Sequence, residues 1–149
     1  MKALKIIPLT LLLFVFLSCH KESETFVSVD TNITILNAQG QNLLDDPKLY
    51  AESNINIYHL VNGVEQLVNQ PLLDHSKGFA IIKDEKGKST LRVYLNNNRK
   101  EKTSITLIKF GDSPADKIEA EFSYKGSSIV LEKVWFNGEP KDVNFIIVK

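Results

Sequence analysis

The chain has 149 residues, with 18 lysines and arginines against 18 aspartates and glutamates, so its formal net charge at pH 7 is zero. This length allows one domain with a substantial core and is too short for two comfortable ones. The balanced charge gives no strong field, so nothing in the composition indicates nucleic acid as a partner. A single cysteine excludes an intramolecular disulfide.

The start of the chain has the three-part pattern of a secretory signal peptide. Lys2 and Lys5 give a positive end, residues 6–17 are apolar with two interruptions, and Ser18 precedes Cys19. A twelve-residue helix would span about 18 Å at about 1.5 Å per residue, against about 30 Å of membrane hydrocarbon. The segment is therefore too short for a membrane span, and we predict an export signal that ends before the cysteine.

The residues that close this segment carry a family resemblance. Phe16-Leu17-Ser18-Cys19 resembles the lipobox of bacterial lipoproteins, which reads Leu, then Ala, Ser or Thr, then Gly, Ala or Ser, then Cys. The last two residues match, while the first two differ from the commonest ones. The resemblance implies removal of residues 1–18, a diacylglycerol on the sulfur of Cys19 and acylation of the new amino terminus. A soluble export signal that happens to contain a cysteine is the alternative.

The residues after the cysteine indicate a tether and a destination. Residues 19–25 are short, polar and mixed in charge, which predicts a lipidated tether ahead of a domain over residues 26–149. No aspartate follows Cys19, whereas in enteric bacteria that residue favours inner-membrane retention. Lys21 followed by an acid also resembles an export signal of some gut bacteria, although an ordinary solvated tether explains it equally. We expect a lipid anchor in the outer membrane of a Gram-negative bacterium, on a face left undecided.

The predicted domain consists of about nine short strands separated by turn signals. No segment of ten residues shows a convincing helical period, and the connections are too short for crossover helices. We therefore expect an all-β fold, a single antiparallel β-sandwich of immunoglobulin-like or transthyretin-like topology, with a small β-barrel as the alternative. The expected strands span residues 27–35, 54–61, 64–69, 79–83, 90–95, 104–110, 118–124, 129–136 and 143–148.

Two Asn-Gly pairs, at 62–63 and 137–138, predict type I′ hairpin turns, because both central residues of such a turn need positive φ. We expect the first turn to join the second and third strands. We expect the second to pair residues 130–136 with the final strand. That register would place Phe145 and Ile147 on the core face.

The histidines give a weak catalytic signal. His59 falls in a strand, and His75 lies in a loop as part of Asp74-His75-Ser76. This tripeptide contains the residue types of a catalytic triad, but adjacency in sequence is not triad geometry, and no Gly-x-Ser-x-Gly elbow accompanies it. We interpret it as a solvated loop and assign no catalytic residue.

The acidic residues are interpreted in the same way. Asp45-Asp46 could join a calcium site with Asp74 or Asp84, yet an acidic pair before a proline is more often turn chemistry. Glu119 and Glu121 would sit about 7 Å apart, near the separation that glycosidases use, but a wet strand face explains them. We predict neither a metal site nor a cofactor.

The aromatic residues give the more suggestive signal, and we take Tyr94 and Trp135 as candidate ligand-binding residues. If Val134 and Phe136 enter the core, Trp135 faces outward, where it could stack on a sugar ring or fill a partner's pocket. Alternatively, both faces are covered and Trp135 is part of the core.

These patterns favour a lipid-anchored, non-catalytic binding or interaction module of the cell envelope. Its partners would be the membrane, through the anchor, and a glycan or another envelope protein. The alternative is a small envelope hydrolase or an inhibitor-type lipoprotein. A deep polar cleft that gathers His59 or His75 with carboxylates would favour this alternative.

Overall fold

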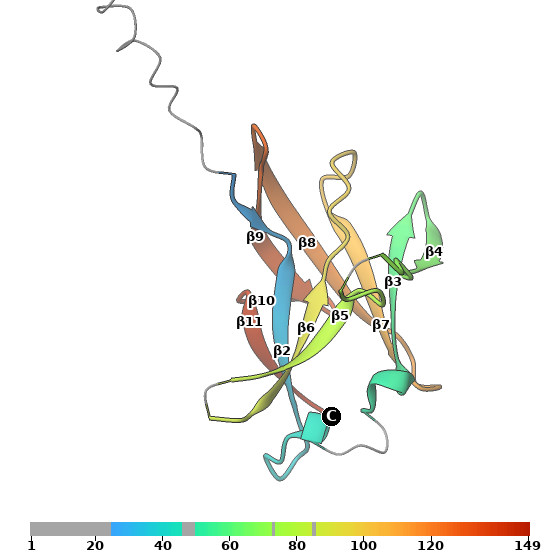
Figure 1. Cartoon of the computed structure of the whole chain (residues 1–149), viewed down its shortest axis with the longest axis vertical. Helices are drawn as coiled ribbons and strands as arrows, with labels where there is room; N and C mark the ends of the chain where they lie inside the picture. Colours follow the sequence, from blue (N-terminus) through green and yellow to red (C-terminus); the bar gives the residue numbers. More distant parts are fainter. Residues whose placement is uncertain (1–24, 46–49, 73, 85) are drawn as a thin grey trace, which may run out of the picture.

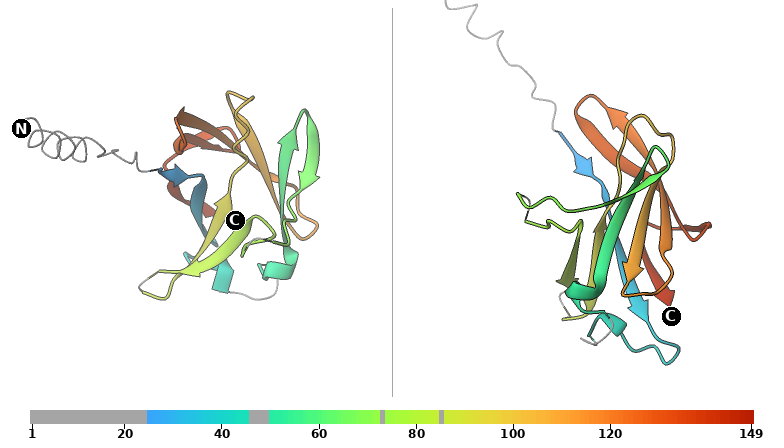
Figure 2. Two further views of the ribbon diagram at one scale, coloured as in Figure 1. Left: turned by 45° about the horizontal axis from the view of Figure 1, so that its top comes forward. Right: turned by 90° about the vertical axis from the view of Figure 1, so that its right-hand side faces the viewer.

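A computed structural model describes residues 25–45, 50–72, 74–84 and 86–149 (Figure 1). The expected signal peptide over residues 1–18, Cys19 and the tether up to residue 24 lie outside these ranges. The described strands form two sheets that pack against each other rather than one closed barrel, which confirms the all-β sandwich (Figure 2). No helix within the described ranges is both long and apolar enough to cross a membrane.

The larger sheet has seven strands in the order β1-β9-β8-β7-β3-β4, with β10 also paired to β9. Its strands are β1 (Val27–Ser28), β3 (Ile55–Val61), β4 (Val64–Leu67), β7 (Ser104–Phe110), β8 (Asp116–Lys125), β9 (Ser128–Phe136) and β10 (Glu139–Lys141).

The smaller sheet has four strands in the order β11-β2-β6-β5. They are β2 (Asp30–Leu36), β5 (Phe79–Lys83), β6 (Ser89–Tyr94) and β11 (Asn144–Val148), and two 3-10 turns, η2 (Leu43–Asp45) and η3 (Glu52–Asn54), lie between β2 and β3.

Period-two alternation builds the core, as the sequence predicts. In β2, Thr31, Ile33 and Ile35 are buried, while the residues between them are only half-buried. The same alternation in β3, β6, β7 and β8 brings apolar side chains of both sheets into one cluster. This burial of apolar surface is the main favourable contribution to folding.

The expectation of purely antiparallel pairing is wrong at two places, because β1 runs parallel to β9 and β11 runs parallel to β2. The extended segment 27–36 belongs to both sheets, since it leaves the larger sheet after β1 and enters the smaller one as β2. Short connections force antiparallel pairing only between consecutive strands, and these two pairs join strands that are far apart in the chain.

The predicted partner of the second Asn-Gly turn is also wrong. That turn pairs β9 with the three-residue strand β10, and the final strand β11 joins the smaller sheet. Phe145 and Ile147 nevertheless face the core, as predicted, because the alternation of β11 is preserved. Together, β10 and the division of residues 27–36 account for eleven described strands rather than nine.

Candidate ligand-binding cavity

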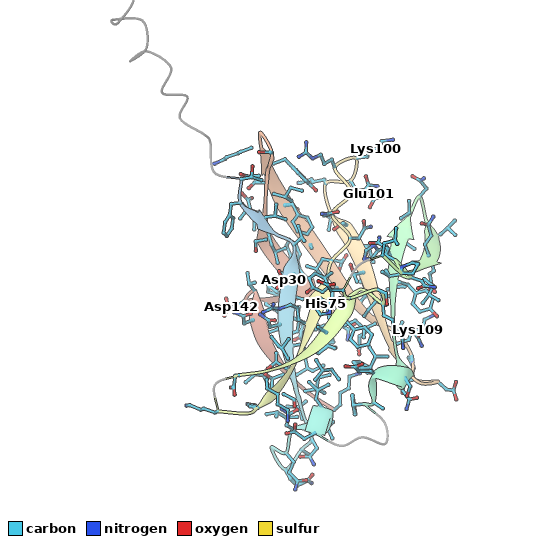
Figure 3. The ribbon with its side chains drawn as sticks, in the orientation of Figure 1. Asp30, His75, Lys100, Glu101, Lys109 and Asp142 are labelled. Atoms are coloured by element: carbon cyan, nitrogen blue, oxygen red, sulfur yellow. The ribbon has the colours of Figure 1, made fainter. Side chains whose placement is uncertain are left out.

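A cavity of about 370 Å³ lies where the two sheets separate, beside the segment 68–78 that crosses from the larger sheet to the smaller one. This volume is within the range of small-molecule sites. Figure 3 labels His75, which lies near the centre of that view. The lining residues are Val29, His59, Val68, Gln70, Asp74, His75, Gly78, Tyr94, Leu95 and Asn97.

His59 reaches the cavity because it continues the inward-facing series of β3 after Ile55 and Ile57. The side chain is half-buried, and its Nε2 lies 3.3 Å from the carbonyl oxygen of Tyr94, to which it donates. Burial lowers the pKa of His59, and the bond to the carbonyl oxygen only partly opposes this. The imidazole is therefore neutral at pH 7, with Nδ1 free to accept a hydrogen bond in this tautomer.

An aromatic pair forms one wall of the cavity. The rings of His75 and Tyr94 stack with centroids 5.5 Å apart and planes inclined by 17°. The loop that carries His75 is held by backbone hydrogen bonds from Gly78 N to the His75 oxygen, at 2.9 Å, and from Tyr94 N to the Gly78 oxygen, at 3.0 Å. The stacking geometry thus depends on the attachment of the loop to β6.

Gly78 allows this attachment for two reasons. Its φ of +76° lies in the left-handed region that side chains other than glycine disfavour. A Cβ at this position would also lie 2.8 Å from Cγ1 of Val68, which lines the cavity as well. The close approach of the two ends of the crossing therefore requires a glycine.

The two aromatic residues singled out from the sequence lie in different places. Tyr94 lines the cavity, whereas Trp135 lies on the outer face of the larger sheet, between Glu119 and Pro140 of the neighbouring strands. Val134 and Phe136 are buried, and Trp135 is half-buried. The outward orientation is thus the correct one of the two alternatives for Trp135.

The cavity also brings together residues whose proximity the sequence does not predict. His59, Asp74 and His75 all line it, although the sequence indicates an ordinary strand residue and a solvated loop. The sequence contains one signal for His59. This residue follows Ile55 and Ile57 at two-residue intervals, so it lies on the same face of β3 as these buried isoleucines. No local pattern predicts that the loop residues fold over the same space.

Two of the acidic residues considered for calcium, Asp45 and Asp84, have other partners. Asp45 Oδ1 accepts a hydrogen bond from Ser89 Oγ at 2.5 Å, and Asp84 Oδ1 accepts the backbone N–H groups of Lys86 and Lys88 within its own turn. Asp46 lies outside the described residues. Within the described ranges, no three or more His, Cys, Asp or Glu side chains gather closely enough to hold a metal ion.

Glu119 and Glu121 share the outer face of β8, as predicted, and each is paired with a lysine. Glu119 lies 3.0 Å from Lys117 Nζ, and Glu121 lies 3.1 Å from Lys133 Nζ. The hydrogen bond from Lys133 holds the pKa of Glu121 below its usual value. This lowered pKa does not suit the carboxyl group of Glu121 to act as a proton donor near neutral pH.

The lining residues themselves indicate what the cavity can bind. No known protein family, curated protein or solved structure matches this chain. The lining combines an aromatic wall and aliphatic side chains with the amides of Gln70 and Asn97 and the carboxylate of Asp74. Among the described residues, no serine, threonine or cysteine lines it. Such a lining can hold a small ring-shaped ligand by stacking and hydrogen bonds.

Proposed function

We propose that this protein is a lipid-anchored binding module of the bacterial cell envelope, and that its ligand site is the cavity beside the crossing segment 68–78. The observation that carries the proposal is the juxtaposition of the His75–Tyr94 stack with polar side chains in one small, mainly apolar hollow. A saccharide ring has apolar faces and hydroxyl edges, so it matches both parts of such a lining. A glycan is therefore the preferred ligand over an envelope protein.

The anchor is tested through Cys19. Several acyl chains supply far more membrane affinity than the polar surface of a small domain, so Cys19→Ser should block lipid labelling and release the processed protein into the soluble fraction. Radiolabelled palmitate and membrane fractionation measure both effects. Processed Cys19→Ser protein that stays with the membrane would contradict lipid anchoring at this residue.

The ligand site is tested by saturation-transfer NMR on the lipoprotein in detergent, with glucose, galactose, mannose and N-acetylglucosamine as probes. We expect transfer to at least one sugar, loss of the signal in Tyr94→Ala, and an unchanged signal in Trp135→Ala. The second variant is the matched control, because Trp135 is, like Tyr94, a half-buried aromatic residue but lies outside the cavity. Loss of the signal in Trp135→Ala alone would place binding on the outer face of the larger sheet and overturn the proposal.

A small hydrolase is the second candidate, because His59, Asp74 and His75 share the cavity. A neutral histidine can serve as a general base, and such catalysis typically contributes about a hundredfold or more. Hydrolysis of p-nitrophenyl acetate by the wild-type protein, reduced at least about a hundredfold in folded His59→Ala, would favour this candidate. We expect no such difference between the two proteins.

A further inference from the structure

A cluster of exposed basic side chains lies at the end of the sandwich from which the chain leads back to the tether. Arg99, Lys100 and Lys102 come from the loop between β6 and β7, and Lys125 comes from the β8–β9 hairpin. Glu101 is the acidic residue within the same loop, and Figure 3 shows it beside Lys100 at this end of the molecule. We call these four basic residues the tether-end basic cluster.

Hydrogen bonds fix the start of the domain against the β8–β9 hairpin. Thr25 Oγ1 and Ser127 Oγ are 2.7 Å apart, Phe26 N donates to Ser128 Oγ at 3.0 Å, and Ile129 N donates to the Phe26 oxygen at 2.9 Å. Figures 1 and 2 show the same arrangement, with β1 beside this hairpin in each view. The hairpin that carries Lys125 is therefore next to the point where the tether begins.

The loop that carries the other basic residues is joined to the same hairpin. The guanidinium of Arg99 lies 4.8 Å above the ring centroid of Tyr124, and the Tyr124 hydroxyl donates to the Asn97 oxygen at 3.0 Å. Tyr124 is the residue before Lys125 in β8. The positive charges of the loop and the hairpin thus belong to one surface.

Two exposed apolar side chains accompany this charge. Phe26 is 62% exposed and Val27 is 57% exposed, although both belong to the segment that pairs with β9. At the opposite end of the sandwich, exposed acids such as Asp45 and Asp112 occur together with exposed lysines such as Lys83. Basic side chains and two exposed apolar side chains therefore lie together at the end that carries the tether.

We propose that the tether-end basic cluster, with Phe26 and Val27, docks on the anionic lipid headgroups of the membrane in which the protein is anchored. This inference rests on the proposed anchor at Cys19. Thr25 is only six residues beyond Cys19, and a chain of that length reaches at most about 20 Å. The tether therefore holds this end of the domain close to the membrane, where basic residues are attracted to anionic headgroups and apolar side chains enter the interface.

The same contacts would set the orientation of the domain relative to the membrane. A tethered surface meets its membrane at a high effective concentration, so an affinity too weak to retain a free protein is enough to orient an anchored one. The opposite end of the sandwich would then point away from the membrane. If this surface bound a partner protein instead, the binding would not depend on the charge of the lipids.

The test uses the lipidated protein reconstituted in vesicles of phosphatidylcholine, or of phosphatidylcholine and phosphatidylglycerol in equal parts. Amide hydrogen exchange of residues 97–102 and 125–128 is followed by mass spectrometry. We expect exchange roughly tenfold slower in the anionic vesicles, and recovery of fast exchange in high salt, because the interaction is electrostatic. Equal exchange in the two kinds of vesicle would overturn the proposal and point to a partner protein as the occupant.

Two matched double variants sharpen the test. Lys100→Glu/Lys125→Glu should abolish the slowing in anionic vesicles, whereas Lys83→Glu/Lys86→Glu should preserve it. Both variants change the net charge equally at exposed lysines, but the second pair lies on the β5–β6 hairpin, away from the tether end (Figure 1). An equal loss in both variants would overturn the proposal. A protein that acquires no acyl chain refutes the anchor, whereas a lipidated protein with lipid-independent exchange refutes only the docking.

Discussion

The two Asn-Gly turns of the larger sheet have nearly the same backbone conformation. Asn62 and Asn137 have φ angles of 52° and 51°, and the glycines after them have 79° and 86°. Each turn begins a short return strand, and after each strand the chain crosses to an edge of the smaller sheet. The first crossing takes the eleven residues 68–78, and the second takes only residues 142–143.

The length of the crossing decides whether the gap between the sheets is closed or left open as a cavity. The short crossing is held by hydrogen bonds from Thr31 Oγ1, at 2.5 Å, and Asn32 N, at 3.3 Å, to the Val143 oxygen, and it leads directly into buried residues of β11. The long crossing instead folds its exposed loop over the gap between the sheets, where it lines the cavity. Two turns of nearly the same conformation are thus followed by a closed core in one case and by a candidate binding site in the other.

The largest expected effect is a difference in stability between substitutions in β11, which follows the short crossing, and in β4, which precedes the long one. Phe145, in β11, is 8% exposed and packs against Phe136, whereas Leu67, in β4, is 54% exposed. Phe145→Ala should lower the free energy of unfolding by about 3–5 kcal/mol, because it leaves a cavity in the core. Leu67→Ala should cost less than about 0.5 kcal/mol. Urea denaturation measures both values, and similar costs would show that β11 is not part of the core.

The second effect tests whether the turns themselves are equivalent. A Cβ added at Gly63 or Gly138 would meet no atom within 4 Å, so the main cost of substitution is conformational. Gly63→Val and Gly138→Val should each lower the free energy of unfolding by about 2–3 kcal/mol, since a β-branched residue is strained at positive φ. A large loss in only one of the two variants would show that the turns differ in their own energetics as well as in the length of their crossings.

The sequence predicts those features of the fold that depend on local periodicity. Alternation places Ile33, Ile35 and Phe145 correctly in the core, and positive φ is found at both predicted turns. Sequence reasoning fails where pairing depends on distant segments, as for β11 beside β2. It also misses the irregularity between β8 and β9, where Glu121 faces Lys133, Phe122 faces Leu131, and Glu132 is left without an opposite residue.

The candidate site is less predictable than the fold. Tyr94 stands out in the sequence as an aromatic residue on a strand, and it does line the cavity. Its stacking partner His75 and the nearby Asp74 belong to the long crossing, whose path is determined by the fit of Gly78 against Val68. Such a contact between two residues of an irregular segment leaves no periodic signal in the chain.

A smaller effect distinguishes the side chains of the two turn asparagines. Asn137 Oδ1 accepts the backbone N–H of Lys117 at 2.8 Å, and its Nδ2 donates to Asp116 Oδ1 at 3.0 Å. The buried Asp116 also forms an ion pair with Lys149 Nζ at 2.5 Å, although not as an oriented hydrogen bond. Asn137→Ala should therefore cost about 1–2 kcal/mol more than Asn62→Ala, because it leaves polar groups unsatisfied. Thermal denaturation of the two variants measures the difference, and equal costs would mean that the bonds of Asn137 add nothing to stability.

The smallest expected effect is a pH dependence of the free energy of unfolding. It arises from His59, which faces the cavity beside the long crossing. Burial lowers the pKa of His59 in the folded protein, while in the unfolded chain it should lie near the usual value of about 6.5. Between these two values the unfolded state binds more protons, so stability should rise with pH up to about 6.5 and then remain level with respect to this group. His59→Gln should remove this rise, as measured by urea denaturation between about pH 5 and pH 8. An unchanged rise in His59→Gln would assign the dependence to another group and would mean that burial beside the cavity does not disfavour the charged imidazole.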